Sequence, residues 1–153
     1  MEDLSLHILD IVDNSLRAAA ANVSIRLVEN TEERTLTLEI EDDGVGMDDE
    51  ELRHAMDPFF TTKSGKKIGI GLSLLCQAAE EVGGSMRIEP GAEFGIKLMA
   101  FFYSDHPDMK PLGDIEKTIR VLRATHPDVI ISFEHFIIPA FQPSAFSPVG
   151  RTH

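Results

Sequence analysis

The chain has 153 residues, the size of one ordinary domain, and a formal net charge of −12 at pH 7. The first 60 residues contain 16 acidic and 4 basic side chains, whereas residues 61–153 contain 10 of each. This acidity argues against nonspecific binding to nucleic acid or to an anionic membrane. The single cysteine, Cys76, excludes an intramolecular disulfide, and no apolar run approaches the roughly 20 residues that span a bilayer. We therefore expect a cytoplasmic domain.

The first half of the chain predicts a helix and a hairpin. Apolar residues recur at helical spacing along one face of residues 4–21. Residues 23–28 and 36–40 alternate apolar and polar side chains around a polar turn, which is typical of two half-buried strands. Gly44 and Gly46 then interrupt the chain before a short acidic helix, which we expect over residues 48–55.

The next segments complete the pattern of an α+β domain. Residues 57–68 predict a loop, and residues 71–82 predict a second helix that ends at a Gly-Gly pair. Two further strands are expected over residues 85–88 and 95–102. This order of elements predicts a two-layer α+β sandwich, in which a mixed or antiparallel sheet has its helices on one face.

The last third of the chain differs in composition. Residues 115–125 predict a helix and residues 129–133 a short strand, whereas prolines recur towards the C-terminus. We expect a first domain over residues 1–102, and a helix–strand extension over residues 103–135 that packs on the same domain. Residues 136–153 are expected to form a loose tail.

One face of the first helix combines three chemically distinct groups. Asp10, Asn14 and Arg17 recur one turn apart, and they offer a carboxylate, an amide and a guanidinium. These groups could supply a general base, a neutral oxygen ligand for a hard cation, and a positive charge for a phosphate. A solvated helix face has the same composition, so this segment alone leaves both interpretations open.

Two further segments suit a nucleotide. Asp42 ends a predicted strand, where its carboxylate can accept a hydrogen bond from an exocyclic amine. Gly44 and Gly46 follow, and they let the backbone approach a flat ligand closely, although a plain turn would contain the same residues. Residues 61–67 contain hydroxyls and three lysines and lead to a helix N-terminus at Gly71, which suits phosphate. A surface loop is the alternative interpretation.

Taken together, in this order and spacing, the segments resemble the GHKL ATPases, the superfamily of gyrase, heat-shock-90 chaperones, histidine kinases and MutL proteins. Residues 10–17 match the N box, residues 42–46 the first glycine box and residues 69–72 the second. The stretch DPFFTTK at 57–63 is similar to the F box of nitrogen-regulation-type histidine kinases. The resemblance covers about residues 4–102 and implies the Bergerat ATP-binding fold.

The resemblance also implies a role for each matching residue. Asn14 would bind the Mg²⁺ that bridges the phosphates of ATP, and Asp42 would accept a hydrogen bond from the adenine amino group. Asp10 stands where hydrolytic members have Glu, and its shorter side chain would position the attacking water rather than activate it. The remaining residues would shape the adenine pocket (Gly44, Gly46, Met47), face the phosphates (Arg17, Lys63) or form the lid backbone and second helix (Gly69, Ile70, Gly71, Leu72).

Arg17 and the DPFFTTK stretch favour the histidine-kinase branch of the superfamily. None of the 6 histidines has both the acidic neighbour and the nearby proline of a phospho-acceptor. The resemblance therefore implies transfer of the γ-phosphoryl group of Mg-ATP to a separate partner protein. An ATP-dependent conformational switch, such as an anti-sigma-like or other regulatory binding module, and a slow ATPase stay open as alternatives. A homodimer is compatible with each of them.

One departure from the kinase pattern concerns the strands before the N-box helix. The two strands that usually precede the N-box helix in kinases are absent, and we hypothesise that residues 129–133 fill that edge of the sheet. The blocks LSLHILDIVDNS and PLGDI also resemble small stand-alone histidine-kinase-like proteins that are found beside iron-hydrogenase genes.

Overall fold

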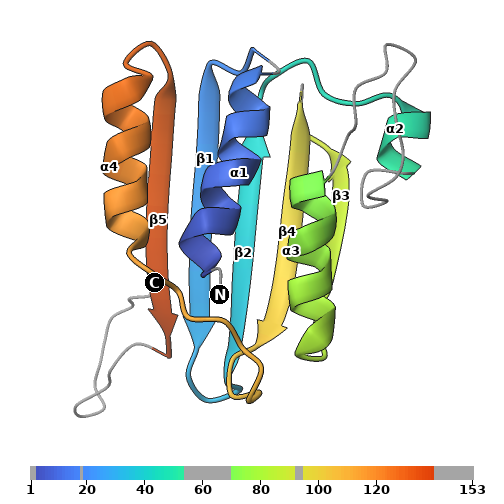
Figure 1. Cartoon of the computed structure of the whole chain (residues 1–153), viewed down its shortest axis with the longest axis vertical. Coiled ribbons are helices and arrows are strands. Elements are labelled where there is room, and N and C mark those ends of the chain that lie inside the picture. The colour runs from blue at the N-terminus through green and yellow to red at the C-terminus, as the bar shows by residue number, and fades with distance from the viewer. Residues whose placement is uncertain (1–2, 18, 54–69, 92–94, 140–153) are drawn as a thin grey trace.

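The computed structural model describes residues 3–17, 19–53, 70–91 and 95–139. Figure 1 shows their helices and strands in chain order. These elements are α1 (Leu4–Arg17), β1 (Asn22–Asn30), β2 (Thr35–Asp42), α2 (Asp49–Arg53), α3 (Ile70–Glu81), β3 (Ser85–Pro90), β4 (Ile96–Tyr103), α4 (Ile115–Thr125) and β5 (Ile130–Ile138). None of the described helices is long and apolar enough to cross a membrane.

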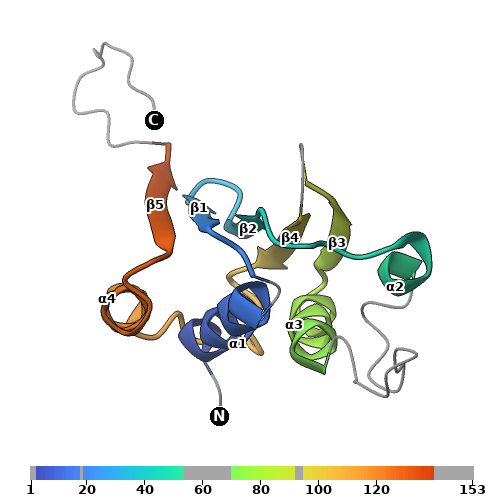
Figure 2. The same cartoon turned by 90° about the horizontal axis from the view of Figure 1, so that it is seen from above.

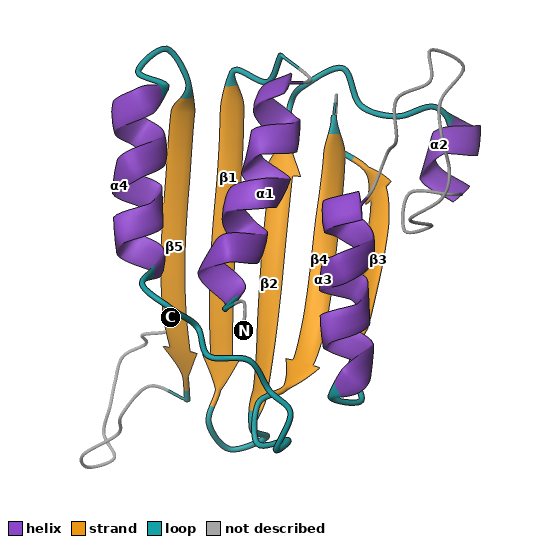
Figure 3. Ribbon diagram, in the orientation of Figure 1, coloured by secondary structure: helices purple, strands orange, loops and turns teal. Residues whose placement is uncertain are grey.

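The strands form a five-stranded sheet in the order β3-β4-β2-β1-β5. Neighbouring strands are antiparallel except β1 and β5, which run parallel, so the sheet is mixed. Helices α1, α3 and α4 cover one face of this sheet (Figures 2 and 3). The predicted two-layer α+β sandwich with its helices on one face is thereby confirmed.

The core lies between the sheet and the three helices. Alternate residues of β1 and β2 point into it, because successive side chains of a strand face opposite sides of a sheet. The apolar stripe of α1 packs against them, with Leu4, Ile8 and Val12 fully buried. The opposite side of α1 stays exposed, which places Asp10 and Asn14 in solvent.

Two predicted boundaries were wrong. The first helix ends at Arg17 instead of residue 21, since Ala19 has a φ of +64°, which α-helix does not allow. The last strand extends to Ile138, so residues 136–138 do not belong to a loose tail. Their backbone continues the parallel pairing with β1 up to Asn30.

Residues 103–138 complete the sheet and its helix layer. As hypothesised, the last strand fills the sheet edge beside β1, and Ile131 pairs with Val23. The apolar stripe of α4 is buried in the same core as α1. The segment between β4 and α4 also contacts α1, because Pro111 O accepts a hydrogen bond from Leu4 N at 3.0 Å.

Substitution of Ile119 by Ala is expected to destabilise the protein by about 2–5 kcal/mol, because it leaves a cavity under α4. The Ile119 side chain is 2% exposed. The matched control is Val121→Ala on the opposite side of α4, where the side chain is 47% exposed and the expected change is within about 0.5 kcal/mol. Chemical denaturation of the two variants measures both values, and an equally small effect of both would contradict the burial of Ile119 in the core.

Candidate functional site

The described parts of the segments singled out in the sequence meet at one end of the sheet. Figure 1 shows that α1 ends there, close to the point where β2 ends at Asp42. Helix α3 begins at the same end with Ile70, and β4 begins there just after Gly95. Residues that are far apart in the sequence are therefore brought together at this end.

Asp42 is the buried carboxylate of this region, with 5% of its surface exposed. Its Oδ2 accepts a hydrogen bond from Ser15 Oγ of α1 at 2.5 Å. Its Oδ1 accepts a hydrogen bond from Gly44 N at 2.9 Å. A buried carboxylate needs such bonds, because desolvation without them is costly. The carboxylate orientation is therefore set by the helix on one side and by the loop after β2 on the other.

Glycine lets two backbone segments approach each other beside Asp42. Gly95 has a φ of +72°, and a Cβ atom there would lie 2.0 Å from Asp42 O and 2.6 Å from Asp42 Oδ1. Gly46 has a φ of +77°, and its Cβ would lie 3.2 Å from Gly95 O. On this side the Asp42 carboxylate is therefore surrounded by main-chain atoms. Such a surface lets a flat heterocycle approach closely.

The neighbouring carboxylate, Asp43, has a different role. Its Oδ1 accepts hydrogen bonds from Ala21 N at 2.8 Å and Asn22 N at 2.9 Å, and its Oδ2 accepts one from Asn22 Nδ2 at 2.8 Å. These bonds, first of all the one from the Asn22 side chain, lower the pKa of Asp43 below its ordinary value of 3.8. Asp43 thus fixes the turn between α1 and β1.

The exposed face of α1 carries the other predicted polar residues. Asp10, Asn14 and Arg17 are all exposed on it, as the helical spacing predicted. Arg17 Nη2 lies 3.0 Å from Asp13 Oδ2, and the two side chains are 78% and 45% exposed. An exposed pair of this kind contributes little free energy, so Arg17 can exchange Asp13 for a phosphate at little cost.

The remaining predicted residues have several locations. Met47 is half-buried and packs against the core, whereas Leu72 is buried within it. Ile70 and Gly71 form the first turn of α3. Lys63 and Gly69 lie outside the described residues, so their predicted contacts with phosphate stay predictions.

Two residues of this region were missed in the sequence. Ser15 donates to Asp42, and the signal that could have identified it is a polar side chain on the buried side of an amphipathic helix. Gly95 makes the closest backbone approach to Asp42. It is the first residue of the strand predicted over residues 95–102, and a glycine within a predicted strand indicates a tight bend or a close contact.

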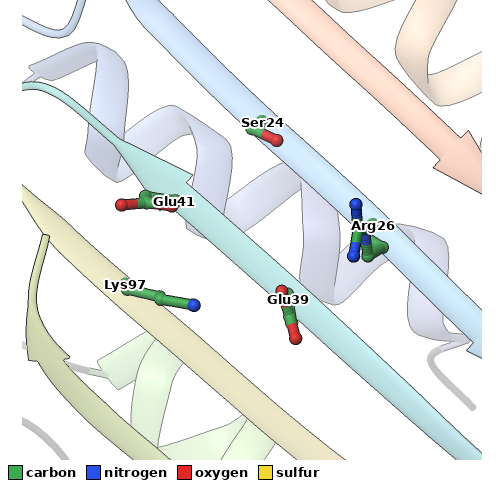
Figure 4. A pocket seen from close by; sticks show the side chains of 5 residues that line it. All are labelled: Ser24, Arg26, Glu39, Glu41 and Lys97. Carbon is green, nitrogen blue, oxygen red and sulfur yellow. The ribbon is translucent and has the colours of Figure 1, made fainter. Parts of the chain in front are cut away.

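A shallow hollow on the uncovered face of the sheet is separate from this region. Figure 4 shows the side chains that line it, which come from β1, β2 and β4: Ser24, Arg26, Glu39, Glu41 and Lys97. It shares no residue with the candidate site. Among the described residues there is also no cluster of three or more acidic, histidine or cysteine side chains that could bind a metal by itself.

The comparisons with known proteins agree with these motifs. Residues 2–101 match the family described as histidine kinase-, DNA gyrase B- and HSP90-like ATPase. The chain is 33% identical over 98 residues to the C4-dicarboxylate transport sensor protein DctB of Pseudomonas aeruginosa, which covers 59% of this chain and 16% of that protein. It is 32% identical over 89 residues to the sensor kinase CckA of Brucella abortus, with 55% and 9% covered. The alignment thus includes only a small part of these relatives.

Solved structures show the same fold. The ATPase domain of Aquifex aeolicus MutL, complexed with ADP, matches 88% of this chain and 60% of its own length with a TM-score of 0.59. The N-terminal domain of a DNA repair protein matches 92% and 51% with a TM-score of 0.56. The sequence identities are 15% and 11%, so these likenesses concern the fold alone.

Proposed function

Because the chain belongs to the family of histidine kinase-, DNA gyrase B- and HSP90-like ATPases, we propose that it transfers the γ-phosphoryl group of Mg-ATP to a separate partner protein. The family and the sensor-kinase relatives make the chain a histidine-kinase-like ATP-binding domain. The transfer step, the metal and the partner are the parts that we propose.

The observation that carries the proposal is the environment of Asp42. A buried carboxylate fixed through Ser15 and Gly44 is a rigid acceptor, and each of its oxygens has a second lone pair for a ligand. No ion pair to Asp42 is found within the described part of the chain. We infer that Asp42 accepts a hydrogen bond from the adenine amino group. In this proposal Gly44, Gly46 and the half-buried Met47 line the ring.

The phosphates would lie along the exposed face of α1. Arg17 would contact them from this helix, and Lys63 from the segment before α3. We propose that Gly69, Ile70, Gly71 and Leu72 place the N-terminus of α3 beside them, where main-chain N–H groups and the helix dipole favour negative charge.

The exposed oxygen groups of α1 fit Mg²⁺. This ion prefers oxygen ligands and usually combines one or two protein groups with water and substrate phosphates. Asn14 would bind it through the amide oxygen, and Asp10 lies one turn away on the same exposed face. When bound, Mg²⁺ would neutralise charge on the phosphates. Asp10 would orient the attacking group of the partner.

The histidines of the described residues support an acceptor in another protein. His7 is 3% exposed within α1, so a phosphate donor cannot reach it. None of the other described histidines is followed directly by the acidic residue, and then by the nearby proline, that the resemblance associates with a phospho-acceptor.

Residues 103–138 would stabilise this ATP-binding unit. We propose that residues 1–102 form the catalytic domain and that the following helix and strand act as its extension. The contacts of Pro111 with α1 and of β5 with β1 support this division of roles.

Calorimetric titration with ATP, with and without Mg²⁺, followed by incubation with γ-labelled ATP and purified candidate partners, tests the proposed function. Binding that strengthens with Mg²⁺ and transfer of the label to one partner are expected. Binding without transfer or turnover would indicate a nucleotide-dependent switch, and slow release of phosphate without transfer would indicate an ATPase. Absence of binding would reject all three functions.

A further inference from the structure

Strand β5 forms one edge of the sheet and has an unusual composition for an edge. It has nine residues, IISFEHFII, and β1 is the only strand of the described sheet that pairs with it. Edge strands usually contain charged side chains, above all lysine, or a proline or a bulge, which discourage another strand from pairing with them. Residues 130–138 contain no lysine or proline, their pairing with β1 is continuous, and the carboxylate of Glu134 is bonded to Arg26.

The main-chain groups of β5 alternate between its two sides. Ile130 N donates to Ala21 O at 2.9 Å, and Ile138 O accepts from Thr31 N at 2.6 Å, so even-numbered residues face β1. Odd-numbered residues therefore direct their N–H and C=O groups away from the sheet. The described part of the chain provides no hydrogen-bond partner for these groups at Phe133 and Ile137.

The beginning of this edge is already occupied. Ile131 O accepts hydrogen bonds from Arg123 Nε at 3.0 Å and Arg123 Nη2 at 2.8 Å. Figure 1 shows α4 beside the first half of β5, whereas the second half extends beyond the helix. The open part of the edge is therefore the stretch from Phe133 to Ile137.

We propose that this stretch binds the same stretch of a second copy of the chain, as an antiparallel pair centred on His135. In this register, His135 lies opposite its own copy, and Phe133 lies opposite Ile137 of the second copy. Each of these residues directs both main-chain groups outward, so the six groups on one copy match the six on the other. A twofold axis perpendicular to the sheet closes the assembly as a dimer.

Two details at the ends of the pair favour this register. Strand β5 of the second copy ends at Ile138, so it places no N–H group opposite the Ile131 carbonyl. The Ile131 carbonyl needs none, because it is bonded to Arg123. A register centred on Glu134 would instead require this carbonyl and would place two Glu134 carboxylates opposite each other, which is destabilising.

The pairing would also cover apolar surface. Ile137 is 55% exposed and Ile138 is 37% exposed. In the proposed register the Ile137 side chain packs beside Phe133 of the second copy, because paired residues of antiparallel strands share a face of the sheet. The candidate ATP site does not contain β5, so each copy keeps its own site. This proposal does not depend on the proposed function.

Measurement of molar mass against concentration tests the association. The wild-type chain should approach twice its 16.9 kDa as concentration rises. Ile137→Pro should raise the dissociation constant at least about tenfold, because each copy loses one main-chain hydrogen bond to the other. Proline is tolerated where the N–H of an edge strand points outward, and circular dichroism verifies that the variant is folded. Ile137→Val, which keeps the N–H, should associate like the wild type.

Disulfide trapping tests the register without a proline. In a Cys76→Ser background, His135→Cys places two cysteines in a directly opposed pair, with Cα atoms about 5.5 Å apart. Glu134→Cys places them diagonally at about 7–8 Å, where a disulfide requires backbone movement. We expect cross-linking at 135 to be at least about tenfold faster than at 134.

Four results would overturn the proposal. These are a monomer at every soluble concentration, a dimer that is indifferent to Ile137→Pro, faster cross-linking at 134 than at 135, and loss of the dimer on deletion of residues 140–153. The last result would place the interface in the C-terminal segment.

Discussion

Replacement of Asp42 by Asn should weaken ATP binding by about 10- to 100-fold while the protein stays folded. Hydrogen bonds to a charged group contribute about 1.5–3 kcal/mol, and about 1.4 kcal/mol corresponds to a tenfold change in affinity. Asn has nearly the same shape, so its Oδ1 can still accept from Gly44 N and its Nδ2 can donate to Ser15 Oγ. The adenine amino group then faces an amide that no longer has the carboxylate charge or the second acceptor.

The control for this variant is Asp43→Asn, which removes the same charge one residue away. Asp43 bonds to the turn after α1 and to Asn22, so its loss should affect stability and leave ATP affinity unchanged. Calorimetry gives the affinities, and a thermal melt monitors the fold. If Asp42→Asn is folded and binds ATP like the wild type, the adenine pocket has been assigned to the wrong residues.

Elements with a strong periodic pattern were predicted accurately from the sequence. Helix α4 was expected over residues 115–125 and occupies the same residues. Its apolar residues recur every three or four positions. Asp114 caps its N-terminus, because Asp114 Oδ1 accepts a hydrogen bond from Lys117 N at 3.0 Å. Both signals are local, which is why the sequence alone contains them.

The boundaries that were wrong depend on residues far away in the sequence. The end of α1 is followed by a turn that Asp43 stabilises from the end of the next hairpin. The extension of β5 past Phe133 includes Glu134 and His135, which look unsuitable for a strand. Arg26 and Glu29 of β1 bond to these two side chains across the sheet, and a local pattern cannot include such partners.

In the candidate site too, the sequence predicted the local features and missed the contacts between distant residues. Asp42, Gly44 and Gly46 follow one another in the sequence, so their spacing alone identified the segment that the fold places around the carboxylate. Ser15 reaches Asp42 across 27 residues, and Gly95 approaches it from the start of β4. These contacts exist only because the sheet brings α1, β2 and β4 to one end, so the sequence did not reveal them.

The second large effect is expected for Gly95→Ala, which should destabilise the protein by roughly 3 kcal/mol and also weaken ATP binding. A positive φ costs a residue with a Cβ about 1–2 kcal/mol, and an overpacked site costs about 1–3 kcal/mol more. The added methyl group would lie 2.0 Å from Asp42 O, so either β4 or the Asp42 backbone has to move. Movement of Asp42 also displaces its carboxylate from the position in which Ser15 fixes it.

Gly83→Ala separates these two contributions. Gly83 has a φ of +83°, but the nearest atom to its Cβ would be Tyr103 Cδ2 at 3.5 Å, an ordinary contact. This variant should therefore have the backbone penalty alone, about 1–2 kcal/mol, with unchanged ATP affinity. Denaturant unfolding and calorimetry of both variants measure the difference. Equal losses of stability would mean that the close approach at Gly95 adds no strain beyond its positive φ. An ATP affinity that Gly95→Ala does not change would mean that this close approach has no part in forming the nucleotide site.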